Sequence, residues 1–195
     1  AVSVVSMRLG GLLEKQDQLD QALAIYAGVL EIEPRNQWAL RGVGRLQEAT
    51  GASPAVLAAT LERLLDVEEG SAASALALRV YELKADLGDP AGGEVALGRG
   101  FAANPADAHA REKLVVIHGD RGEHERVSAI LRQAWEACPH DYRLVMRLAD
   151  SYCRSSNQQA ALEVLNAAVA KSPSQPEVLA HRAALLEQVN RFELA

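Results

Sequence analysis

Histidine and cysteine are the side chains here that could bind a metal or attack a substrate. Cys138 and Cys153 are the two cysteines, too few for a disulfide framework or a four-ligand zinc site. Cys138 and His140 flank Pro139, and two ligands on one tight turn cannot complete a zinc site. The five histidines never stand four residues apart, the spacing that puts two ligands on one helix face; they are His109, His118, His124, His140 and His181. The sequence predicts no metal site.

Nucleophilic catalysis by cysteine requires a base beside the thiol, and no base is placed beside Cys153. The chain has no phosphate-binding G-x-x-x-x-G-K-[ST], no G-x-S-x-G and no H-E-x-x-H. A glycine-rich stretch at 88–100 lacks the preceding strand that a dinucleotide-binding fingerprint needs. We therefore expect no catalytic residue, no cofactor site and no enzyme activity.

Composition narrows the class of partner. The net charge of −6 and a pI near 5.4 argue against nucleic acid, which needs clustered Lys and Arg. The 49% of apolar residues occur in short groups, too short to cross a bilayer, so direct membrane insertion is not expected. With two cysteines, a cytoplasmic location fits best. Ala1 stands where a start Met would be, so we expect a fragment whose parent could carry a signal or anchor elsewhere.

A repeat organises the chain. Pro105, Pro139 and Pro173 stand 34 residues apart, and each closes a similar helical stretch. Such a fixed period is typical of structures that stack like units. In the clearest unit, 141–173, the first helix carries Leu148-Ala149 and Tyr152 on one face. The second helix carries three further packing residues, namely Ala161, Leu165 and Ala168.

This unit resembles the tetratricopeptide repeat, in which W-x2-L-G-x2-Y is followed by small and large apolar residues and a closing Pro. Val145, Leu148, Ala149 and Tyr152 stand at the Trp, Leu, Gly and Tyr places. Two other stretches match in phase, and their matching residues are Leu9, Gly10, Leu13, Ala22, Tyr26, Val29 and Pro34, then Leu114, His118, Val127, Leu131 and Ala134. The 71 residues between Pro34 and Pro105 hold two less regular units, with small insertions expected near the turns.

The resemblance implies an all-α fold, a right-handed alpha-alpha superhelix (a tetratricopeptide-repeat solenoid) of about five and a half helical hairpins, taken from a larger bacterial protein. We expect a single array over 1–195. Its units are predicted at 3–35, 36–70, 71–106, 107–140, 141–174 and, in part, 175–195. Four glycines in the helix expected from Pro90 to Ala102 predict the weakest point of the array there. They either form a hinge or permit close helix packing.

In this family the inner surface is built from fixed places on the first helix of each unit, here called helix A. Projected onto this chain, the peptide-binding or partner-binding candidates are Trp38, Arg41, Arg45, Arg79, Glu82, Arg143, Met146, Arg147, Asp150 and Arg154. Arginine forks suit carboxylates, so these residues favour an acidic peptide, with Trp38 as an aromatic anchor. The alternative is that the arginines pair with carboxylates of neighbouring helices, the candidates being Glu82, Asp150, Glu112 and Asp120.

The resemblance implies a noncatalytic scaffold that binds a protein or peptide in its concave groove. Met7 and Gly11 stand where the carboxylate-clamp members of the family carry Lys and Asn, so chaperone tails are disfavoured. Two alternatives remain open. The chain could be the substrate-recruiting arm of a larger enzyme or of a secretion or assembly machine. It could also form homo-oligomers through exposed array ends, where Leu185, Leu186 and Val189 are expected to present an apolar side.

Overall fold

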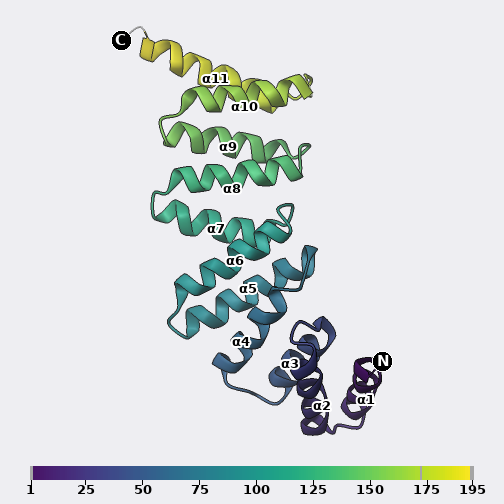
Figure 1. The fold of residues 1–195 in the computed structure, drawn as a ribbon. Coiled ribbons are helices and arrows are strands. Elements are labelled where there is room, and N and C mark those ends of the chain that lie inside the picture. The colour runs from purple at the N-terminus through teal and green to yellow at the C-terminus, as the bar shows by residue number, and fades with distance from the viewer. Residues whose placement is uncertain (1, 172, 194–195) are drawn as a thin grey trace. The chain divides into compact units, whose positions relative to one another are not determined.

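This computed structural model describes residues 2–171 and 173–193, and these residues form helices joined by short turns, with no strand among them (Figure 1). The chain divides into two compact units, the first ending at Asn104 and the second beginning at Pro105. Unit 1 contains α1 (Val2–Lys15), α2 (Leu19–Ile32), α3 (Gln37–Ala49), α4 (Pro54–Leu65), α5 (Gly70–Asp86) and α6 (Pro90–Ala103). Unit 2 contains α7 (Ala108–Asp120), α8 (His124–Ala137), α9 (Tyr142–Arg154), α10 (Gln158–Lys171) and α11 (Pro176–Glu193).

The eleven helices of the described residues confirm the all-α prediction of five and a half hairpins. The bounds of the repeat units stay a prediction. That the hairpins form one array stays a prediction. None of the helices in the described ranges is long and apolar enough to span a bilayer.

Local chemistry sets the helix ends. Pro54, Pro90 and Pro176 each begin a helix, where a missing N–H leaves no hydrogen bond unmade. Side-chain oxygens of Asn36 and Asp141 accept hydrogen bonds from the first-turn amides of their helices. The turns inside the hairpins each contain a residue with positive φ, the set being Asp17, Gly51, Gly88, Gly122 and Ser156. Each reverses the chain between two antiparallel helices.

In unit 1, each helix packs against the next in the chain. A cluster around Leu40, Leu57, Leu61 and Val80 joins α3, α4 and α5, and α6 adds Ala96. A second cluster joins α2 and α3 around Tyr26. The core of this unit is thus a continuous series of seams between neighbouring hairpins.

Unit 2 repeats the scheme from α7 to α11 (Figure 1). Leu131, Leu148 and Leu165 are fully enclosed, one on each of three successive helices. The seam between α8 and α9 also holds a polar pair, because Ser128 donates to Ser151 at 2.9 Å and Ser151 donates to the carbonyl of His124. Satisfied in this way, the buried hydroxyls are tolerated inside the seam.

Two sequence expectations need correction. The extra residues between Pro34 and Pro105 mostly lengthen a helix, because α5 runs for 17 residues while α3, α7 and α9 each have 13. The turn between α3 and α4, at 50–53, is longer by one residue than the turns inside the other hairpins. The sequence from Tyr81 to Asp86 continues the helix with good helix formers. Leu185 is buried at 5% exposure, whereas Leu186 is exposed, so the apolar side of α11 is smaller than expected. The Val189 side chain lies outside the described residues.

The glycines of α6 serve close packing at two places. A Cβ at Gly100 would collide with the Cβ of Ala77, and one at Gly93 would come within 3.0 Å of the Tyr81 ring. The glycines therefore let α6 approach α5 as no other residue could. At Gly98 a Cβ would meet nothing within 4 Å.

Alanine scanning of these glycines separates packing from helix propensity. We expect Gly100→Ala to lower the free energy of unfolding by about 1–3 kcal/mol through overpacking. Gly98→Ala, in the same helix, should raise it by about 0.5–1 kcal/mol because alanine restricts the unfolded chain. Urea unfolding followed by circular dichroism measures both. Equal effects of the two variants would contradict the close-packing account.

Candidate functional site

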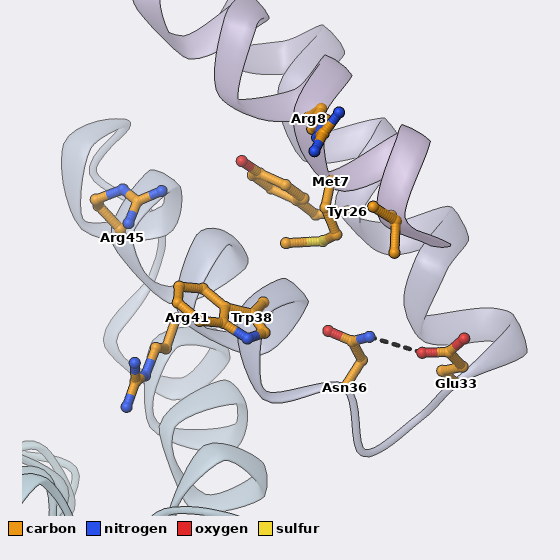
Figure 2. Close-up of a pocket in the computed structure, with 9 residues that line it drawn as sticks. Met7, Arg8, Tyr26, Glu33, Asn36, Trp38, Arg41 and Arg45 are labelled. Carbon is orange, nitrogen blue, oxygen red and sulfur yellow. Dashed lines mark hydrogen bonds between the residues drawn. The ribbon is translucent and has the colours of Figure 1, made fainter. Parts of the chain in front are cut away.

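An open pocket of about 840 Å³ lies between α1 and α3 in unit 1 (Figure 2). Helix α1 contributes three residues, α2 contributes Tyr26, the turn before α3 contributes two, and α3 contributes three. In chain order the lining residues are Val4, Met7, Arg8, Tyr26, Glu33, Asn36, Trp38, Arg41 and Arg45. The pocket combines apolar and aromatic surface with a few polar groups, a composition usual for binding sites.

Tyr26 of α2 forms the inner wall of this pocket, and its ring packs between α1 and α3. A Cβ at Gly10 of α1 would collide with its ring, and a Cβ at Gly42 of α3 would lie 2.6 Å from it. The ring therefore fits between two helices because both carry glycine there. Its hydroxyl donates to Glu14 at 2.5 Å. Burial, together with this bond to a carboxylate, raises the pKa of Tyr26 to about 12.

Trp38 is the exposed aromatic residue of the pocket. Its side chain is 67% exposed, and the Arg41 guanidinium carbon lies 5.7 Å from the ring centroid. A cation at this distance is attracted to the ring face. Arg41 is itself fixed, because it donates to both oxygens of Glu68 at 2.5 and 2.7 Å. The indole therefore stands beside a restrained side chain.

Glu68, in the turn between α4 and α5, is almost fully enclosed, with 4% of its side chain exposed. Gln37 donates to it at 2.9 Å, completing its partners with Arg41. The Arg41 fork holds the pKa of Glu68 below its usual range, against the opposing effect of burial. The primary role of Arg41 is consequently structural, because it holds the buried Glu68 carboxylate.

Arg45 is held in the same manner. It donates to both oxygens of Glu14, at 3.0 and 2.7 Å, across 31 residues of sequence. This fork is the largest cause of the lowered pKa of Glu14, and the Tyr26 hydroxyl adds to it. Glu14, Tyr26 and Arg45 thus form one network across the wall of the pocket.

Pairs between successive A helices recur in both units. In unit 1, Arg79 of α5 lies 3.6 Å from Glu48 of α3. In unit 2, Arg147 of α9 forks Glu112 of α7 at 2.7 and 2.8 Å, and the two residues are 35 positions apart in sequence. His181 of α11 lies 3.0 Å from Asp150 of α9. The Arg147 fork lowers the pKa of Glu112.

The sequence contained the signal for these pairs. Basic residues recur every 34 positions, as Arg45, Arg79, Lys113, Arg147 and His181. The carboxylate partners were not all recognised, since Glu14, Glu48 and Glu68 were absent from both the candidate list and its alternative. Their side chains become partners only once the A helices are laid side by side.

Comparison with known proteins gives a fold and no closer relative. No protein-family model matches the chain, and no curated protein does. The structure of Naa15/Naa10 bound to HypK-THB has a TM-score of 0.57 and 13% identity, and the match covers 99% of this chain and 30% of that one. MamA has a TM-score of 0.47 and 18% identity, with 90% of this chain and 94% of that chain covered. YrrB, a TPR protein with an unusual peptide-binding site, has a TM-score of 0.45 and 20% identity, with 91% of this chain and 90% of that chain covered. The packed helical hairpins of the chain itself and their 34-residue period are typical of the tetratricopeptide repeat. The chain has the tetratricopeptide-repeat fold.

Within the tetratricopeptide-repeat fold, the predicted site residues divide into groups. Trp38, Arg41 and Arg45 meet in the pocket of unit 1. Asp150 and Arg154 line a smaller pocket of about 380 Å³ between α9 and α11, together with Cys153 and His181. The remaining candidates line neither pocket: Arg79 contacts Glu82 at 3.6 Å within α5, Arg143 is exposed, and Met146 and Arg147 are half-buried on α9.

The smaller pocket offers no activated group. Burial and the nearby Asp150 carboxylate raise the pKa of the Cys153 thiol, which disfavours the thiolate needed for nucleophilic attack. Across the described residues, no cluster of three or more His, Cys, Asp or Glu side chains could hold a metal ion. The pocket of unit 1 is therefore the stronger candidate site.

Sequence reasoning missed Arg8 and the apolar wall of that pocket. Arg8 follows Met7, a place that the repeat phase had assigned to the inner surface, and Val4 lies one turn earlier. The position of a residue within the repeat identifies candidate side chains along one face of each helix A. The pocket, however, collects side chains from α1, α2, α3 and a turn.

The Glu68 carboxylate should make the stability of the tetratricopeptide fold depend on pH. Its pKa is lower in the folded state than the value of 4.5 expected for the unfolded chain, so folding favours its ionised form. The contribution is complete above pH 4.5 and is lost as pH falls toward the folded-state pKa. Glu68→Gln should therefore lower the melting temperature at pH 7, and the difference from wild type should shrink as pH falls below 4.5.

Thermal unfolding of both proteins between pH 3 and 7 measures this difference. Glu48→Gln is the matched control, since Glu48 is half exposed and lies 3.6 Å from Arg79. A loss of stability that is the same at every pH would show that Glu68 acts through packing alone.

Proposed function

We propose that this protein is a noncatalytic scaffold that binds a segment of a partner protein on the A-helix face of unit 1. The partner would place an apolar side chain in the pocket between α1 and α3, against Trp38. The observation that carries the proposal is the exposure of Trp38 at 67% beside a restrained Arg41, in a pocket that is open to solvent.

An exposed tryptophan is an unusual feature for a surface that serves solubility alone. Covering the indole would remove enough apolar surface to contribute on the order of 3 kcal/mol of binding free energy. Tryptophan and arginine are also the residues most often found at the centre of protein interfaces. Met7 adds a flexible thioether that can adjust to the shape of an incoming side chain (Figure 2).

The pocket is also preorganised. Arg41 is fixed by Glu68, Arg45 by Glu14, and Tyr26 by the glycines on either side. Because these groups are already ordered, binding would cost little additional conformational entropy. This supports a recognition role for the pocket more than a role in chemistry.

The ion pairs limit how the arginines could act. A ligand carboxylate could bind Arg41, Arg45 or Arg147 only in competition with a glutamate that already forks each guanidinium. The proposed interaction therefore depends on the apolar anchor. Complete conversion of the arginines to glutamate would disturb the fold itself, so it is a poor test.

Trp38→Ala provides the cleaner test. We expect at least a tenfold loss of affinity for peptides selected on the wild-type protein, with an unchanged melting temperature, because the side chain is largely exposed. Val95→Ala is the matched control, since Val95 is 64% exposed on α6 and lies outside the pocket. Isothermal titration calorimetry measures the affinities. Equal binding by wild type and Trp38→Ala would place the partner elsewhere.

Fluorescence gives an independent readout. The chain has two tryptophans, and Trp135 is buried at 8% exposure. In a Trp135→Phe background, Trp38 is the sole reporter, and its emission should shift to shorter wavelength as a peptide covers it. An unchanged spectrum at saturating peptide would contradict contact with the indole.

A further inference from the structure

Arg8 differs from the other arginines of the pocket. It is exposed on α1, next to Met7, and it makes no ion pair or hydrogen bond with any residue that the structure describes. Arg41 and Arg45, in contrast, each hold both oxygens of a glutamate. Arg8 is therefore the one guanidinium of this pocket whose donors are available within the described chain.

The charges around the pocket indicate which kind of ligand Arg8 would bind. The charges of Arg41 and Arg45 are neutralised by their paired glutamates. Glu33, at the start of the turn before α3, accepts a hydrogen bond from Asn36 at 2.6 Å and lies apart from Arg8 (Figure 2). Among the described residues of this pocket, Arg8 is therefore the positive charge that no carboxylate pairs, and it lies on the α1 side of the apolar wall.

We propose that Arg8 determines the specificity of the pocket by binding the carboxylate of an Asp or Glu that neighbours the apolar anchor of the partner segment. The inference rests on the proposed function, because it requires the anchor to occupy the space beside Trp38. The partner is then an acidic, apolar segment of another protein.

The chemistry favours this ligand over the alternatives. A guanidinium offers a planar pair of donors that matches a carboxylate, and a charge-assisted bond is stronger than a neutral one. A carboxylate at Arg8 displaces no glutamate, whereas one at Arg41 or Arg45 must. A basic segment would bring its charge close to Arg8, which no glutamate fork neutralises, and like charges at an interface disfavour the wrong partner.

Selection from a phage-displayed library of random dodecapeptides tests both proposals at once. Wild type, Arg8→Gln, Arg8→Glu and Trp38→Ala serve as targets, with Arg143→Gln as the matched control, since Arg143 is exposed on α9 and lies outside the pocket. Circular dichroism verifies that each variant is folded. Affinities of the selected peptides are then measured by fluorescence anisotropy at low and high salt.

Wild type and Arg143→Gln should select peptides in which Asp or Glu flanks an aromatic or aliphatic residue. Arg8→Gln should bind those peptides about 5-fold to 10-fold more weakly and lose part of the salt dependence. Arg8→Glu should select Lys or Arg in place of the acidic residue.

The other outcomes separate the two proposals. If Trp38→Ala loses binding while Arg8→Gln keeps the acidic preference, the role of Arg8 is wrong and the proposed function stands. If neither substitution changes binding, both are wrong. Failure of wild type to select any peptide overturns the proposed function, and the role of Arg8 falls with it.

Discussion

Within each unit, the hairpins depend on close approach to one another, because a pair of helices alone leaves much of its apolar surface in water. The approach requires residues without bulk at set places and one large residue to fill the resulting space. Tyr26 is one example, since a Cβ at either Gly10 or Gly42 would collide with its ring. The same constraint explains why α6 keeps glycine at 93 and 100 in spite of its low helix propensity.

The ion pairs add a second layer to these seams. Arg45 with Glu14 in unit 1, and Arg147 with Glu112 in unit 2, link successive A helices through paired hydrogen bonds. Their contribution to stability is modest where they are exposed. Each fork also occupies a guanidinium that an anion could otherwise bind. This is why we assign anion binding to Arg8, which no glutamate of the described chain occupies.

Much of the fold could be predicted from the sequence, because a repeated pattern gives the same answer several times. The prolines, the Leu148-Ala149 and Tyr152 motif, and the alternation of helices all agreed on helical hairpins. The lengthening of α5 could not be predicted, since three extra residues fit a longer turn as well as a longer helix. The burial of Leu185 could not be predicted, because the sequence of one helix does not show which of its apolar residues meet the preceding helices.

The site was only partly predictable. Repeat phase identified Trp38, Arg41 and Arg45 on α3, which do lie together in one pocket. It could not show that two of them are already occupied. Which carboxylate meets which guanidinium depends on side-chain positions one helical turn apart, and Glu68 comes from the turn between α4 and α5 and not from the helix-A places that the repeat identifies.

The long α5 also decides which hairpins can be exchanged in engineered versions of this protein. The paired base is the ninth residue of α3 but the sixth residue of both α9 and α11. The basic residues therefore keep their 34-residue spacing along the chain, whereas the starts of the helices shift relative to them by about one helical turn. A chimera that transplanted a hairpin of unit 1 into unit 2 would keep its apolar seam but bring its base to the wrong height on the helix. Shuffling is compatible with the ion pairs only among hairpins from the same side of α5.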